Sequence, residues 1–153
     1  MIRQNFSLDN GWKVEVYYLV TSVNTDVVSD SLKGIGCEKE VIRDVENKLA
    51  EEKENTGFTY SNTDAGKSVM VIGAASSAKE FFNTLVHEMG HLTRHISKKV
   101  GADPYGEEEQ YIIGEIAMKM FPVASRFMCE GCRKSVYDEV VAYQRFSDVF
   151  KFL

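Results

Sequence analysis

Several features that define other protein classes are scarce in this chain of 153 residues. No apolar run approaches the ~18 residues that a membrane-spanning helix needs, and the first five residues contain no apolar leader. Basic residues do not dominate, because 18 Lys and Arg stand against 23 Asp and Glu. The net charge of −5 gives nucleic acid no electrostatic attraction. We therefore expect no membrane and no nucleic-acid partner.

Cysteines, linkers and repeats are also scarce. Three cysteines, an odd number, do not suit a disulfide framework. They favour a reducing compartment, so we expect a cytoplasmic protein. No repeat, low-complexity tract or Pro/Gly/Ser-rich linker divides the chain. Since domains commonly span about 100–150 residues, we predict a single domain over residues 1–153.

The spacing of apolar residues predicts strands early in the chain and helices late. The predicted strands span residues 12–23, 58–60 and 67–73. The predicted helices span residues 38–53, 77–99 and 107–121, with a further helix beyond Cys132. Ser77 opens the second helix as a cap, and Pro122 ends the third. This order favours an α+β fold over alternating βαβ units.

The clearest chemical signal is the segment 87–91, which reads HEMGH and matches the pattern HExxH. His87 and His91 are four residues apart, so both imidazoles lie on one helix face and can bind one Zn²⁺ ion. Glu88 is then expected beside the metal, as the general base that takes a proton from metal-bound water and returns it to a leaving amine. The chain has only three histidines, which makes a chance match improbable. The alternative is a pair of surface histidines on an amphipathic helix.

A catalytic zinc site normally has three protein ligands and one position open to water. His95 is excluded, because it lies about 12 Å beyond His87 along the helix. Ser97 stands where a metzincin has its third histidine. A carboxylate is therefore expected, either among the acids at the start of the next helix or at Asp103 in the preceding loop. The other reading of those acids is a solvated helix start, which the helix dipole favours.

The motif and the acidic helix together resemble gluzincin-like metallopeptidases, particularly short single-domain bacterial and phage-type proteins, over residues 67–121. The resemblance implies a zincin-like fold: a small mixed or antiparallel sheet, then the HExxH helix and a glutamate helix. It implies Glu107 as the third ligand and Tyr111 as the residue that orients a ligand, with Gly114 allowing close helix packing. The remaining carboxylates that could replace Glu107 are Glu108, Glu115 and Glu109. It also implies that strand 67–73 borders the cleft and pairs with an extended peptide or protein substrate. An internal core strand is the equal alternative for this apolar run.

A lone CxxC motif, Cys129 to Cys132, has no second pair to complete a zinc knuckle. We interpret these cysteines as incidental residues in a turn. A rival interpretation joins them to His87 and His91 in a structural zinc site without catalysis. The sequence therefore predicts a zinc metallopeptidase first. Its alternatives are a structural zinc protein or a degenerate zincin-like protein that acts by interaction.

Overall fold

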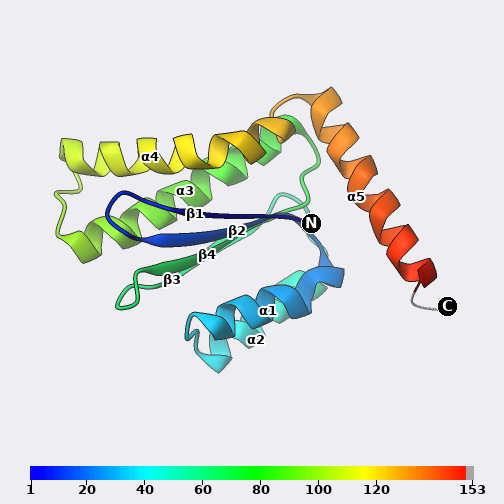
Figure 1. The fold of residues 1–153 in the computed structure, drawn as a ribbon, viewed down its shortest axis with the longest axis horizontal. Helices are drawn as coiled ribbons and strands as arrows, with labels where there is room; N and C mark the ends of the chain where they lie inside the picture. The colour runs from blue at the N-terminus through cyan, green and yellow to red at the C-terminus, as the bar shows by residue number, and fades with distance from the viewer. Residues whose placement is uncertain (151–153) are drawn as a thin grey trace.

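The computed structural model describes the backbone of residues 1–150 and the side chains of residues 1–148 (Figure 1). The strands in this part of the chain are β1 (Ile2–Ser7), β2 (Lys13–Val20), β3 (Gly57–Asn62) and β4 (Lys67–Gly73). They form one four-stranded sheet in the order β1-β2-β4-β3. β2 and β4 are parallel, whereas β1 and β3 run antiparallel to their neighbours. The α+β class with a mixed sheet is therefore confirmed.

Helices cover both faces of this sheet (Figure 1). The α-helices of the described residues are α1 (Thr25–Gly34), α2 (Lys39–Ala50), α3 (Ala78–Val100), α4 (Glu107–Ala124) and α5 (Glu130–Phe150). α1 and α2 lie on one face, α3 and α4 lie on the other, and α5 runs past one end of the sheet. None of the helices in the described part of the chain combines the length and the apolar character that a bilayer crossing requires.

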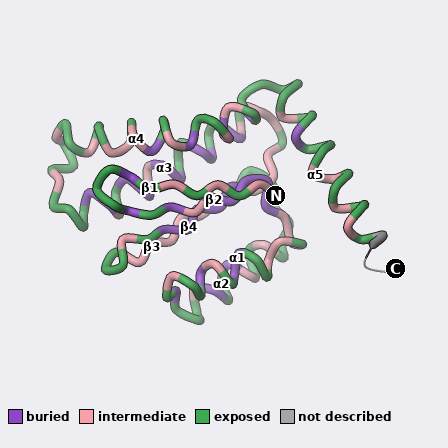
Figure 2. The backbone as a smooth tube through the Cα atoms, in the orientation of Figure 1, coloured by how far each residue is buried: buried purple, intermediate pink, exposed green. Residues whose placement is uncertain are grey.

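β4 occupies the interior of the sheet because both of its faces are apolar. Met70 and Ile72 belong to the core beneath α3 and α4, while Val69 and Val71 belong to the core beneath α1 and α2. Figure 2 shows the buried residues concentrated in the same layers. A strand buried on both faces reads as a continuous apolar run. Of the two interpretations of residues 67–73, the internal core strand is therefore confirmed and the edge strand is wrong, since β3 is the edge.

α3 carries the HExxH segment and is built by local sequence. Ser77 caps it, accepting a hydrogen bond from the backbone N–H of Glu80 at 3.1 Å, as predicted. Gly101 ends it in the left-handed conformation, with φ of 75°. Between these ends, one apolar stripe packs on the sheet and α4: Phe81, Leu85, Leu92 and Ile96. The flank beside this stripe faces β3 and presents the histidines.

Other sequence predictions also need correction. β1 and α1 were not predicted, and α1 and α2 separate β2 from β3, so strands and helices are not segregated along the chain. α4 continues past Pro122 to Ala124, because a proline in the last turn removes only one hydrogen bond. A Cβ added at Gly114 would meet no atom within 4 Å. Gly114 therefore does not mark close helix packing.

Candidate metal centre

The two HExxH histidines converge on one point at the surface of α3. Their Nε2 atoms are 3.0 Å apart, and their rings are nearly perpendicular, at 81°. Two nitrogens that bind one tetrahedral zinc ion at about 2.0–2.1 Å lie about 3.3 Å apart. The observed pair therefore needs only a small adjustment. Both side chains are exposed, so an ion can reach them from solvent.

Glu88 completes the only group of side chains among the described residues that could hold a metal ion, called the metal group below. The ligand atoms of His87, Glu88 and His91 all lie within 4.8 Å of one another. Glu88 is 3% exposed, in contrast to the two histidines. It points inward because it lies one position after His87 on the helix, on the side that faces β3. The HExxH segment thus places two exposed imidazoles beside a buried carboxylate.

The contact between Glu88 and β3 depends on alternate residues of the strand. Thr59 Oγ1 donates to Glu88 Oε2 at 2.7 Å. Gly57 lies two residues earlier on the same face, and a Cβ there would lie 2.9 Å from Glu88 Cγ. That Cβ would also lie 2.7 Å from the backbone oxygen of Val71. Only glycine therefore lets Glu88 approach the strand this closely.

Ser61 is the third residue on this face of β3, and it binds the remaining histidine. Its hydroxyl is 2.8 Å from Nδ1 of His95 and 2.7 Å from the hydroxyl of Ser68, which accepts from the indole N–H of Trp12 at 2.8 Å. Burial lowers the pKa of His95, and the neighbouring His91 and Lys98 lower it further. His95 is not part of the metal group, which agrees with its exclusion on helical spacing. Through its hydrogen bond with Ser61, His95 links α3 to β3.

Sequence reasoning did not single out the β3 residues that hold Glu88. The available signal was alternation: Gly57, Thr59 and Ser61 are small or hydroxylated, while Phe58 and Tyr60 between them pack on the opposite core. Such alternation is typical of a strand with two different faces. Their connection to Glu88 could not be predicted, because it depends on where α3 crosses the sheet.

The structure does not bring the predicted α4 residues to the histidines. Glu107 is the first residue of α4 and is not part of the metal group within the described chain. His91 lies nine residues before the end of α3, a distance of about 14 Å along the axis, whereas Glu107 follows the turn at that end. Tyr111, one turn further along α4, is 74% exposed. Ligation by Glu107 and a role for Tyr111 stay predictions.

Two of the other carboxylates have structural partners instead. Glu115 Oε1 accepts a hydrogen bond from the backbone N–H of Asp9 at 2.7 Å, which ties α4 to the turn between β1 and β2. Asp103 Oδ1 accepts from the backbone N–H of Tyr105 at 2.9 Å in the turn before α4. Glu108 and Glu109 lie in the first turn of α4 and are also outside the metal group of the described residues.

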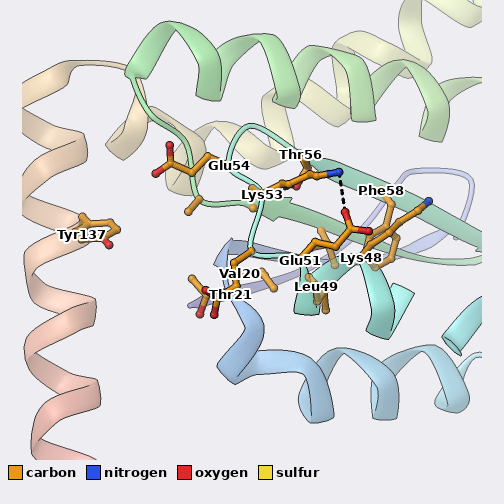
Figure 3. A pocket seen from close by; sticks show the side chains of 15 residues that line it. Val20, Thr21, Lys48, Leu49, Glu51, Lys53, Glu54, Thr56, Phe58 and Tyr137 are labelled. Carbon is orange, nitrogen blue, oxygen red and sulfur yellow. Dashed lines mark hydrogen bonds and ion pairs between the residues drawn. The ribbon is translucent and has the colours of Figure 1, made fainter. Parts of the chain in front are cut away.

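A cavity of about 690 Å³ lies at the carboxyl ends of β2 and β4 (Figure 3). Val20, Leu49 and Val71 belong to its wall, so it opens toward the α1 and α2 layer. An ion pair between Lys53 and Glu51, at 2.8 Å, lies on its rim. No histidine lines this cavity. None of His87, Glu88 and His91 lines it, although Gly57, which lies against Glu88, does.

The arrangement as a whole supplies two nitrogen ligands and one oriented carboxylate. Comparisons with protein-family models, with curated proteins and with solved structures found no match to this chain. The chemistry of these side chains therefore carries the functional proposal.

Proposed function

We propose that this chain is a zinc-dependent metallopeptidase in which His87 and His91 bind the metal and Glu88 is the general base. The observation that carries the proposal is the convergence of two Nε2 atoms, 3.0 Å apart, beside a buried carboxylate. Neutral imidazole nitrogens are preferred zinc ligands. When bound, zinc supplies a Lewis acid that lowers the pKa of water and polarises a carbonyl group.

The surroundings of Glu88 fit a cation at this position. Glu88 is 3% exposed, and Thr59 is a neutral partner. Among the described residues no lysine or arginine forms an ion pair with Glu88. A buried carboxylate without a nearby positive charge is costly. A metal ion on His87 and His91 would supply that charge.

Glu88 also has the freedom that a general base needs. Thr59 holds Oε2, while no hydrogen bond to Oε1 is found among the described residues. Oε1 is also not fully buried. Among the described residues, Ser97 Oγ is the one side-chain oxygen or nitrogen that is fully buried without a hydrogen-bond partner. Oε1 can therefore accept a proton from water and pass it to a leaving amine.

The open edge of β3 supports a peptide substrate. β3 pairs only with β4 in the described sheet, so its other edge has unpaired backbone groups. An extended peptide can add to such an edge by main-chain hydrogen bonds. Because Gly57 and Thr59 contact Glu88, a peptide on this edge would lie next to the base. This location favours a peptide or protein substrate over a small ester.

A third protein ligand is part of the zincin proposal, with Glu107 as the first choice and Tyr111 as an orienting residue. Both lie on α4 outside the metal group of the described residues. Ligation by Glu107 would require the turn between α3 and α4 to move toward the histidines. The position of Glu107 and Tyr111 outside the metal group favours the second candidate function, which is a degenerate zincin-like protein that binds zinc without hydrolysis. The cysteines are also outside the group, so nothing favours a His/Cys site.

The test is zinc content and hydrolysis of fluorescently labelled casein by the same samples. We expect wild type to hold about one zinc ion per chain and to cleave casein. Glu88→Gln should keep zinc and lose at least about 100-fold in rate. His87→Ala should lose zinc, while His95→Ala is the matched control that keeps it.

Two outcomes would overturn the peptidase. Wild type that holds zinc but cleaves neither casein nor a random peptide library would establish the non-catalytic candidate. Loss of zinc from the double variant Cys129→Ser and Cys132→Ser would establish the structural His/Cys site. Retention of zinc and activity by that variant supports the proposal.

A further inference from the structure

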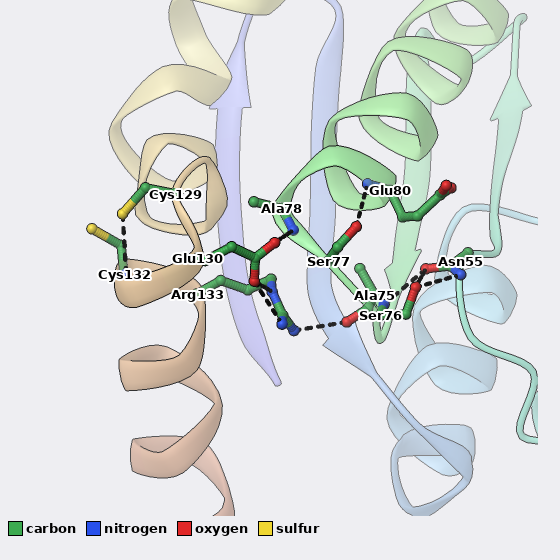
Figure 4. Close-up of polar contacts among 10 residues, drawn as sticks. All are labelled: Asn55, Ala75, Ser76, Ser77, Ala78, Glu80, Cys129, Glu130, Cys132 and Arg133. Atoms are coloured by element: carbon green, nitrogen blue, oxygen red, sulfur yellow. Dashed lines mark hydrogen bonds and ion pairs between the residues drawn. The ribbon is translucent and has the colours of Figure 1, made fainter.

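Two cysteines that the proposed function does not use lie at the start of α5 (Figure 4). Cys129 immediately precedes the helix, and Cys132 lies in its first turn. Both are exposed and neither is in a disulfide. The backbone N–H of Cys132 donates to Sγ of Cys129 at 3.1 Å. The structure thus places the pair at a helix N-terminus, where the sequence interpretation had only a turn.

The two sulfur atoms have different surroundings, because Cys129 Sγ accepts the hydrogen bond from the Cys132 backbone. A hydrogen bond from the Cys132 thiol, followed by the Cys132 backbone N–H, lowers the pKa of Cys129, although Glu130 opposes this shift. The same thiol contact raises the pKa of Cys132. The positive end of a helix dipole also favours a thiolate. Cys129 therefore has the features of an attacking thiolate, and Cys132 those of a second thiol that follows it.

The first turn of α5 is held in place by contacts with the start of α3 and the segment before it (Figure 4). Glu130 Oε1 accepts from the backbone N–H of Ala78 at 2.6 Å. Arg133 donates to Glu130 Oε2 at 3.0 Å and to the backbone oxygen of Ala75 at 2.9 Å. The backbone N–H of Arg133 donates to the backbone oxygen of Cys129 at 2.9 Å, so Cys129 continues the helical spacing of α5. Residues three apart on a helix have Cα atoms about 5 Å apart, within the range that a disulfide spans.

A metal site does not explain the pair. Tetrahedral structural zinc sites need four protein ligands. Among the described residues, no third histidine, cysteine or carboxylate joins Cys129 and Cys132 in a group of metal-binding geometry. Two exposed thiols without further ligands are suited to sulfur chemistry instead.

We propose that Cys129 and Cys132 form a thiol–disulfide exchange site that reacts with low-molecular-weight disulfides such as oxidised glutathione. The Cys129 thiolate attacks one sulfur of the disulfide, and its partner sulfur leaves as a thiolate and takes up a proton. Cys132 then loses its proton and attacks Cys129 Sγ, which releases the second thiol. The protein pair is oxidised by two electrons, and the external disulfide is reduced to two thiols. A small disulfide fits because both sulfur atoms lie at the surface, where it needs no groove.

The test exposes the reduced full-length chain to oxidised glutathione, quenches with acid and iodoacetamide, and measures intact mass and peptide maps. We expect wild type to form one internal disulfide between Cys129 and Cys132. Cys132→Ser should accumulate a glutathione adduct on Cys129. Cys129→Ser should form an adduct on Cys132 at least about tenfold more slowly. Cys37→Ser is the control and should match wild type, because Cys37 is buried.

Equal adduct rates for Cys129→Ser and Cys132→Ser would overturn the proposal. So would a wild-type chain that retains glutathione without closing the internal disulfide. Unfolding of a variant is checked by circular dichroism, and the wild-type peptide map decides the result without any variant. No hydrolysis is measured, so failure here leaves the peptidase proposal unaffected.

Discussion

Glu15 and Glu88 are both glutamates held between the sheet and a helix, but on opposite faces. Glu15 lies on β2 facing α1, with its side chain 20% exposed. It accepts hydrogen bonds from Arg3 at 2.6 Å and from the hydroxyls of Tyr17 and Ser31. Glu88 is more deeply buried, yet Thr59 is its one side-chain donor among the described residues.

The two carboxylates differ in how far the protein itself balances their negative charge. The Glu15 carboxylate has a cation and two further donors, so its negative charge is balanced within the protein. The Glu88 carboxylate has one neutral donor and lies beside two exposed imidazoles. Burial of a negatively charged carboxylate with so few partners in the protein is energetically unfavourable. Glu15 therefore fits a role in stability, while the surroundings of Glu88 support its proposed role beside a bound cation. Variants around each glutamate test this contrast.

The largest expected effect comes from Gly57→Val. A Cβ at Gly57 would lie 2.7 Å from the backbone oxygen of Val71 and 2.9 Å from Glu88 Cγ. The carbonyl cannot rotate away without breaking the sheet, so Glu88 and the strand must both shift. We expect a loss of about 3 kcal/mol in the free energy of unfolding, measured in urea, together with loss of casein hydrolysis.

Gly114→Ala is the matched control for Gly57→Val. Its Cβ would meet no atom within 4 Å, and Gly114 lies inside α4. Alanine is favoured over glycine inside a helix by about 1 kcal/mol, so this variant should be slightly more stable than wild type. A Gly57→Val variant as stable as wild type would show that Glu88 does not depend on close contact with β3.

Thr59→Val should have the next largest effect. Valine keeps the shape of threonine but removes the donor to Glu88 Oε2, at a cost of about 1.5 kcal/mol. As a positioning residue, Thr59 should affect kcat by about tenfold and leave KM unchanged. Thr59→Ser should restore both stability and kcat, since it returns the hydroxyl.

Ser61→Ala is the control for Thr59→Val on the same face of β3. Its hydroxyl contacts His95 rather than Glu88. The variant should therefore lose some stability but keep wild-type kcat. If Thr59→Val and Ser61→Ala lower kcat equally, Thr59 acts through the fold alone and the assignment of Glu88 weakens.

The parts of this molecule that sequence reasoning predicted are those that local spacing determines. The HExxH helix, its Ser77 cap and the strand at 67–73 follow from periodicity and capping within a few residues. β1 was missed because, as an edge strand, it exposes every second residue, and its sequence IRQNFS has few apolar residues. α1 was missed because its apolar stripe is short and gives an equally weak helical pattern.

The contacts that define the candidate site are mostly non-local, and this explains what the sequence could not provide. Glu88 meets Gly57 and Thr59, which lie about 30 residues earlier in the chain and reach it only through sheet order. The expectation that Glu107 joins the histidines came from the resemblance to gluzincin-like metallopeptidases. It did not take into account that an antiparallel α4 places its first turn beside the far end of α3.

The smallest expected effect is the pH dependence that Glu15 contributes. Burial raises the pKa of Glu15, but hydrogen bonds from Ser31, Tyr17 and Arg3 outweigh it and hold the pKa below its ordinary value. A lowered folded-state pKa stabilises the protein above the unfolded pKa of about 4.3. That contribution is lost as the pH falls through the lower, folded value. Urea unfolding from pH 7 to pH 3 should show Glu15→Gln less stable than wild type at neutral pH, with the difference shrinking in acid. Parallel stability curves would mean that the Glu15 charge is not balanced by its partners, and the contrast with Glu88 would then have no basis.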